Sequence, residues 1–138
     1  MSYVGWAVVA MLAYGVTAIF LKLALKDIPP GVTLVITNSI LVLSGIVLIV
    51  YRGESFAAHI SANRPLLFAG LAGLTLSLSI ISYYIALSRG QTSVVVPIFA
   101  MYFTVTTIIG FIFLGEEIRL TRILGVLLAG GAIFLLTR

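Results

Sequence analysis

The chain has 138 residues, of which 62% are hydrophobic and only 9% are charged, and its mean hydropathy is +1.26. A water-soluble domain carries about 25% charged residues, so this chain has too few to cover a surface in water. The composition excludes a soluble globular domain and predicts an all-α, multi-pass integral protein of the cell membrane.

The charged and reactive residues exclude several further function classes. The net charge of +4 is spread over predicted loops and helix ends, so we expect no basic patch for nucleic acid. The chain has no cysteine, which excludes disulfides, thiolate metal sites and a cysteine nucleophile. His59 is the single histidine and lies in a polar loop. We therefore expect no catalytic centre, no metal site and no cofactor, and we expect that the protein is not an enzyme.

Long apolar runs divide the chain into five predicted transmembrane helices. Their expected bounds are about 3–25, 31–51, 65–88, 92–114 and 120–137. The first run lacks a basic start and is too long for a cleaved signal, so we expect it to be the first span. Pro30 and Pro65 stand at the starts of the second and third helices, where the first turn tolerates proline. No linker divides the chain, and we expect a single membrane domain over residues 1–138.

The basic residues are balanced across the predicted membrane. An odd number of spans puts the two termini on opposite sides, and each side then carries four Lys or Arg residues. One side holds Arg52, Arg64, Arg119 and Arg122, and the other holds Lys22, Lys26, Arg89 and Arg138. The balance predicts dual topology, in which two oppositely inserted copies form an inverted pair. The alternative is a single orientation, with Lys22 counted as intramembrane.

Two polar side chains fall inside the first two predicted helices, where hydrocarbon makes unpaired polar groups costly. Lys22 shares a face of small residues in the first helix. It either attracts an anion or acts as a gate, or it snorkels to the helix end. Asn38 is the most polar uncharged side chain predicted deep inside a span. It either binds substrate or clamps two helices together by a hydrogen bond.

The third predicted helix carries hydroxyl groups around most of its circumference. Helical spacing places Ser79 and Ser82 on one face and Tyr84 on another, and Tyr83 lies beside Tyr84. We expect these four residues to line a polar path, although a hydroxyl can also bond back to the carbonyl four residues earlier. The residues left for lipid are Leu76, Ile80 and Leu87.

The fourth predicted helix contains Pro97 within its first two turns, which frees a backbone carbonyl around Ser93. We expect Pro97 to act as a kink or hinge. Tyr102 and Thr106 share one side of this helix, and an aromatic group beside a hydroxyl suits an amphipathic organic solute. The alternative for Tyr102 is ordinary packing. No carboxylate falls in mid-span, so the group that usually couples transport to protons is absent.

The fifth predicted helix carries small residues along one stripe. Such stripes let two helices approach closely. We therefore expect helix association rather than substrate binding from Gly125, Ala129, Gly130 and Ala132.

Three segments of the chain resemble a known family of membrane proteins. They are "AYGVTAIFLKLAL", "YYIALSRGQTSVVVPIFAMYFTVTTIIGFIFLGEE" and "ILGVLLAGGAIFLL". Their order and spacing resemble an EamA-type repeat of the drug/metabolite transporter superfamily. Members commonly carry two such five-helix units in one chain, oppositely oriented, with the substrate path between them. The resemblance implies that this single unit pairs with itself or with a related half.

These observations predict a half-size secondary transporter that works by alternating access. The expected partners are a second copy in an antiparallel ten-helix homodimer, membrane lipid, and a small polar or amphipathic metabolite such as an amino acid. The candidate path residues are Lys22, Asn38, Ser79, Ser82, Tyr83, Tyr84, Tyr102 and Thr106. One alternative is a subunit of a lipid or lipid-linked-sugar flippase. Another is a non-transporting membrane interaction protein, in which the polar stripes only hold helices together.

Overall fold

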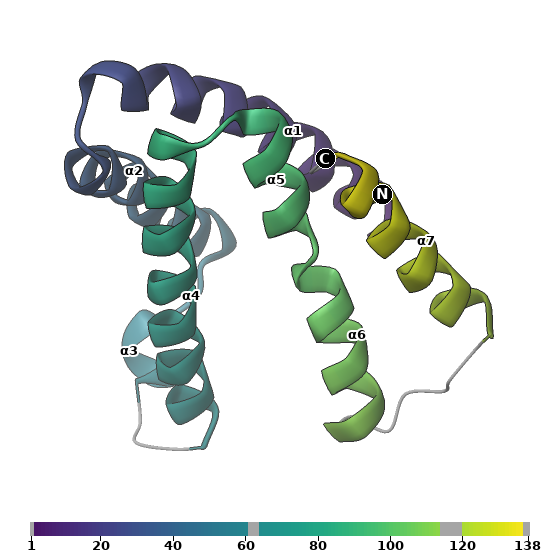
Figure 1. Ribbon diagram of the computed structural model, residues 1–138. Coiled ribbons are helices and arrows are strands. Elements are labelled where there is room, and N and C mark those ends of the chain that lie inside the picture. The colour runs from purple at the N-terminus through teal and green to yellow at the C-terminus, as the bar shows by residue number, and fades with distance from the viewer. Residues whose placement is uncertain (1, 61–63, 114–119, 137–138) are drawn as a thin grey trace. The chain divides into compact units, whose positions relative to one another are not determined.

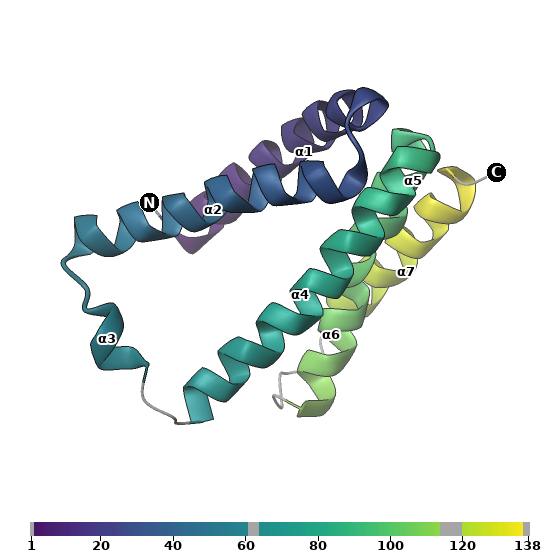
Figure 2. The same cartoon turned by 90° about the vertical axis from the view of Figure 1, so that its left-hand side faces the viewer.

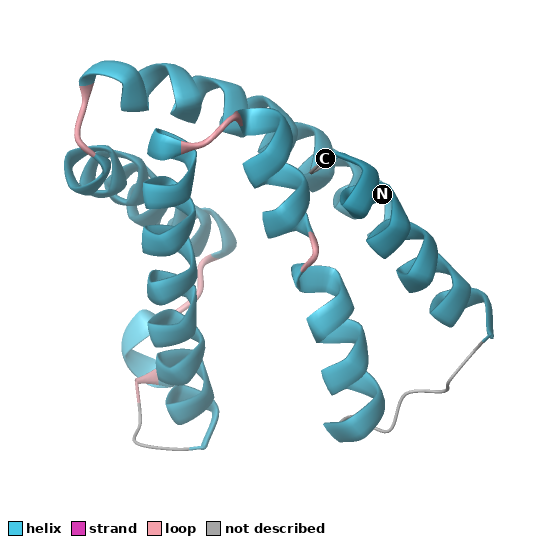
Figure 3. Ribbon diagram, viewed as in Figure 1, coloured by secondary structure: helices cyan, strands magenta, loops and turns pink. Residues whose placement is uncertain are grey.

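The computed structural model describes residues 2–60, 64–113 and 120–136, which are helical apart from short turns and contain no strand (Figure 3). The helices of this part of the chain are labelled in Figure 1. They are α1 (Tyr3–Asp27), α2 (Pro30–Arg52), α3 (Phe56–His59), α4 (Arg64–Arg89), α5 (Thr92–Ala100), α6 (Tyr102–Phe113) and α7 (Leu120–Leu136). The predicted all-α membrane fold is confirmed. The short α3 was not predicted.

Within the described residues, four stretches are long and apolar enough to cross a membrane. Helices α1, α2 and α4 contain 25, 23 and 26 residues, and at 1.5 Å per residue each covers at least about 34 Å. The fourth is Thr92–Gly110, and a shorter apolar helix, Ile123–Leu135, follows. Leu114 and Thr137, the last residues of two predicted spans, lie outside the described residues.

Local sequence signals explain where the first helices begin and end. The Ser2 hydroxyl accepts a hydrogen bond from the Gly5 amide at 3.2 Å and so caps the start of α1. Pro30 occupies the first turn of α2, as predicted. After α2, Gly53 adopts a left-handed conformation with φ of 65°. This turn lets the Glu54 amide bond back to the Ile49 carbonyl at 3.0 Å, which closes the helix.

The described chain forms two compact units, Met1–Ser88 and Arg89–Arg138. In the first unit α1 and α2 pack as an antiparallel hairpin (Figure 2). The buried residues of this unit are Ala18, Leu21, Leu25, Thr33, Tyr83, Tyr84 and Leu87. All of them lie at one end, where α1 stops, α2 begins and α4 stops.

Leu87 corrects one expectation from the sequence. It was assigned to lipid because it lies away from the hydroxyl face of its helix, yet its exposed fraction is 0%. The reason is that α1 approaches the last turn of α4, where the Lys22 ammonium reaches the Leu87 carbonyl. Helical periodicity defines the faces of a helix but not the side from which a neighbour packs.

The second unit contains α5, α6 and α7, with α5 packed against α7. The fourth span was predicted over about 92–114 with a kink or hinge at Pro97, and the described helix is interrupted at Met101, four residues after that proline. There the Met101 amide bonds to the Ile98 carbonyl at 3.1 Å, and the Thr104 amide bonds to the Met101 carbonyl at 2.9 Å. These three-residue turns tighten the chain one turn after Pro97, which has no amide hydrogen to donate and disturbs the helical ladder.

Candidate functional site

Lys22 connects α1 to the C-terminal end of α4. Its half-buried ammonium donates a hydrogen bond to the Leu87 carbonyl at 2.7 Å. Carbonyls in the last turn of a helix lack an intrahelical donor, and the helix dipole places partial negative charge there. The ammonium therefore sits where both a hydrogen-bond acceptor and a favourable field are present. This arrangement stabilises a charged side chain inside an apolar helix.

A second bond connects α2 to α4 through two hydroxyl groups. The Thr37 Oγ1 and Tyr84 Oη atoms are 2.8 Å apart, and the Thr37 oxygen is also 2.9 Å from the Thr33 carbonyl. A threonine hydroxyl has a single hydrogen, which the Thr33 carbonyl takes. Either oxygen can be the donor between Tyr84 and Thr37, and we infer that Tyr84 donates. The result is a directed chain of hydrogen bonds from Tyr84, through Thr37, to the backbone of α2.

Tyr83 and Tyr84 are both buried next to these hydrogen bonds. Their exposed fractions are 4% and 7%, and their rings meet edge to face with centroids 6.2 Å apart and planes at 67°. Such a geometry is favourable for two aromatic rings. We define the polar cluster as Lys22, Thr37, Tyr83, Tyr84 and the Leu87 carbonyl.

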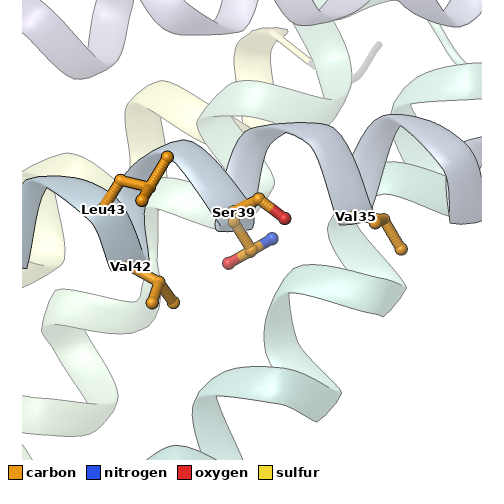
Figure 4. Close-up of a pocket in the computed structure, with 5 residues that line it drawn as sticks. Val35, Ser39, Val42 and Leu43 are labelled. Atoms are coloured by element: carbon orange, nitrogen blue, oxygen red, sulfur yellow. The ribbon is translucent and has the colours of Figure 1, made fainter.

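Asn38 follows Thr37 and borders a hollow on the side of α2. The hollow has a volume of about 510 Å³ and is open to the outside; its described lining is Val35, Asn38, Ser39, Val42 and Leu43. Figure 4 shows Val35, Ser39, Val42 and Leu43 along this helix. The Asn38 amide nitrogen donates to the Leu34 carbonyl at 2.9 Å, which uses one of the two amide hydrogens. The second hydrogen and the amide oxygen have further bonding capacity.

This hollow is an open depression, and its described lining comes from one face of α2. Here three aliphatic side chains stand with one amide and one hydroxyl, and the described lining contains no charged residue. The lining is suited to an amphipathic molecule.

The two serines predicted for the path lie on the exposed surface of α4. The Ser82 hydroxyl donates to the Leu78 carbonyl at 2.8 Å, four residues earlier in the same helix. Ser77 does the same with the Gly73 carbonyl. The structure brings Lys22 to the Leu87 carbonyl, three residues after Tyr84, but Ser79 and Ser82 are exposed. A path role for these two serines stays a prediction.

The predicted residues of the fourth span belong to the second unit. Tyr102 is 62% exposed, and its ring centroid lies 5.7 Å from that of Phe99. The Thr106 hydroxyl donates to the Tyr102 carbonyl at 3.0 Å. Pro97 is half-buried in α5, four residues before the break at Met101. Tyr102 and Thr106 thus form a row on α6, directly after the break.

The stripe of small residues on α7 leaves room beside its glycines. Gly125 and Ala132 are exposed, and Ala129 and Gly130 are half-buried. A Cβ atom added at Gly125 or Gly130 would meet no atom within 4 Å. Helix association through these residues therefore stays a prediction.

Sequence reasoning missed two members of the polar cluster. Thr37 was not proposed as a site residue, and the Leu87 carbonyl has no signature in a sequence. The i, i+4 spacing of Thr37 from Thr33 was visible in the sequence. The pairing of Thr37 with Tyr84, 47 residues later, depends on how α2 and α4 pack.

Over the described ranges 2–60, 64–113 and 120–136, no group of three or more histidine or acidic side chains is placed to hold a metal ion. Because the polar cluster offers hydroxyls, an ammonium and a carbonyl, its chemistry is hydrogen bonding rather than metal coordination.

The sequence profile of the EamA-like transporter family matches residues 1–138. A relative described as "Uncharacterized transporter in cobO 3'region", from Sinorhizobium sp, is 27% identical over 135 residues, which is 97% of this chain and 96% of the relative. No solved structure matches. With its long apolar helices, the chain is a multi-pass integral membrane protein that belongs to the EamA-like transporter family.

Proposed function

We propose that this protein is a half-size secondary transporter that moves a small polar or amphipathic metabolite, such as an amino acid, as a dimer. The observation that carries the proposal is the match to a transporter family over residues 1–138, and the open hollow beside Asn38 offers a surface for a solute. Its aliphatic lining would contact the apolar part of a solute, and Asn38 would bond its polar part.

The proposed substrate class follows from the charged groups available. The described lining of the hollow is uncharged, which favours a solute without a large net charge. Lys22 supplies an ammonium in the same unit and would attract a carboxylate. An amino acid combines a carboxylate, an ammonium and an organic side chain in a molecule that this volume can accommodate.

The proposed pairing follows from the size of the unit and its charges. The relative from Sinorhizobium sp has nearly the same length as this chain, so the match does not depend on a second fused unit. The balance of four basic residues on each predicted face supports insertion in both orientations. We propose an antiparallel homodimer in which the two copies enclose the substrate path and expose it alternately to each side.

A transport assay tests this proposal. Purified protein in liposomes should exchange internal labelled amino acids for external ones, and Asn38→Ala should lower the rate about tenfold if one hydrogen bond to a polar solute group is lost. Ser44→Ala is the matched control, because Ser44 lies on the same helix and its hydroxyl bonds to the Ile40 carbonyl of its own turn.

Two other results would refute it. If soluble amino acids stay inside while a lipid-linked sugar crosses the bilayer, the flippase alternative is correct. If neither class moves, and Asn38→Ala changes only the thermal stability, the polar groups serve helix packing alone.

A further inference from the structure

Among the described residues of the first unit, burial is confined to one end of the helices. Every residue of α1 from Trp6 to Thr17 is exposed, whereas Ala18, Leu21 and Leu25 are buried. In α4, every residue from Arg64 to Ser79 is exposed, and burial begins only in its last turns. Figure 2 shows α4 leaving the α1–α2 hairpin from this end, while α3 lies at the other. The unit is therefore closed at one end and splayed at the other.

Two bonds that connect different helices lie at the closed end. One runs from the Lys22 ammonium to the Leu87 carbonyl at 2.7 Å, and the other joins Tyr84 to Thr37 at 2.8 Å. Lys22 and Thr37 belong to the two arms of the hairpin, so α4 is held by both arms. Tyr84 and Leu87 are three residues apart and lie on the same side of α4.

We propose that these two bonds form a releasable latch, and that their release separates the end of α4 from the hairpin and opens the first unit at its closed end. The inference rests on the proposed function, because it assigns one gate of the transport cycle. Hydrogen bonds suit this role, since an entering solute or water can replace either partner, whereas interlocked apolar side chains have no such substitute.

The two bonds contribute a large share of what holds the closed end together, because few apolar side chains are buried there. Among the described residues these are Ala18, Leu21 and Leu25 of α1 and Tyr83, Tyr84 and Leu87 of α4. An ammonium bound to a carbonyl is a charge-assisted bond and is roughly twice as strong as a neutral one. The bond from Lys22 therefore contributes more to the stability of the closed end than the bond from Tyr84 does.

A thiol reporter tests the latch without any transported solute. The protein has no cysteine, so Leu25→Cys introduces a single thiol at a position that is 8% exposed at the closed end. Its reaction rate with a water-soluble maleimide in liposomes measures how often this end opens. Tyr84→Phe should raise the rate about threefold, and Lys22→Met about tenfold or more, because each variant removes a bond of the latch and keeps the size of the side chain.

Ser77→Ala is the matched control for the hydroxyl deletion. It removes a hydroxyl from the same helix, but that hydroxyl bonds only to its own turn at the Gly73 carbonyl. The Leu25→Cys thiol should then react at the parental rate. Far-ultraviolet circular dichroism and elution volume confirm that each variant stays folded. If Lys22→Met does not fold, Tyr84→Phe alone decides, because it retains the ring and its packing.

Three outcomes would overturn the latch. They are unchanged thiol reactivity in both latch variants, an equal rise in the Ser77→Ala control, or a thiol that is already fully reactive in the parent. None of these depends on flux, so a latch that fails leaves the transport proposal intact. Conversely, thiol rates that respond as expected in a protein that moves no solute would refute the transport proposal alone.

Discussion

The direction of the hydrogen bond between Tyr84 and Thr37 predicts that deleting either hydroxyl lowers the free energy of unfolding by a different amount. Tyr84 is buried and donates to Thr37, while Thr37 also donates to the Thr33 carbonyl of its own helix. Removing the tyrosine hydroxyl leaves Thr37 with a partner. Removing the threonine hydroxyl leaves the buried Tyr84 hydroxyl without its acceptor. The two single variants should therefore differ, although they delete the same bond.

The expected magnitudes follow from this difference. Tyr84→Phe loses a neutral hydrogen bond with a net contribution of about 0.5–1.5 kcal/mol. Thr37→Val leaves a buried donor unsatisfied, which costs about 1–3 kcal/mol. In the double variant no orphaned hydroxyl remains, so its free energy of unfolding should be close to that of Tyr84→Phe alone. The coupling free energy should then be about 1 kcal/mol or more.

A double-mutant cycle measures these values. The free energy of unfolding of the four proteins is determined in detergent micelles by reversible denaturation, with loss of helical circular dichroism as the signal. Thr75→Val is a matched control for the threonine change, because its hydroxyl bonds only to carbonyls of its own turn, Leu71 and Ala72. Additive effects, or a smaller cost for Thr37→Val than for Tyr84→Phe, would refute the donor direction argued here.

Three further predictions concern orientation, the helix break and a helix terminus. Ser55→Cys lies after α2, and an impermeant thiol reagent should label about half of the copies in whole cells if insertion is dual; one-sided labelling contradicts self-pairing in an inverted sense. Pro97→Ala should restore a continuous helix across Met101 and lower solute exchange about tenfold, and an unchanged rate contradicts the hinge. Gly53→Ala should destabilise by about 1 kcal/mol because of its φ of 65°, seen as a lower melting temperature, whereas Gly45→Ala, in mid-helix with open space, should not.

Much of the fold could be predicted because hydrocarbon imposes simple rules. A span needs about 20 apolar residues, and the long apolar runs of this chain show where the spans are. Pro30 and the Gly53 turn mark helix ends by their own backbone preferences. The break at Met101 was harder to predict, because Pro97 disturbs the ladder but the chain places the tight turn one turn later.

The candidate site was only partly predictable because it depends on which helices meet. Most hydroxyls on the predicted stripes satisfy themselves on their own helix, as Ser44, Ser77 and Ser82 do. Abundant hydroxyls therefore do not mark a path by themselves. Tyr84 differs because its hydroxyl is too far from its own backbone to bond back, so its burial required a partner on another helix.

The need of buried polar groups for partners also decides which side chains can hold two copies together in a membrane. Exposed leucines on α2 and α4 are no sign of an interface, because lipid tails are as apolar as leucine. Association then depends on close packing at small residues and on polar groups that lipid cannot satisfy. Asn38 is half-buried in the chain and has bonding capacity beyond its bond to Leu34. In the proposed dimer that capacity must be met by solute, by water or by the second copy, so Asn38→Ala should weaken solute exchange, pairing or both, whereas Ser44→Ala should weaken neither.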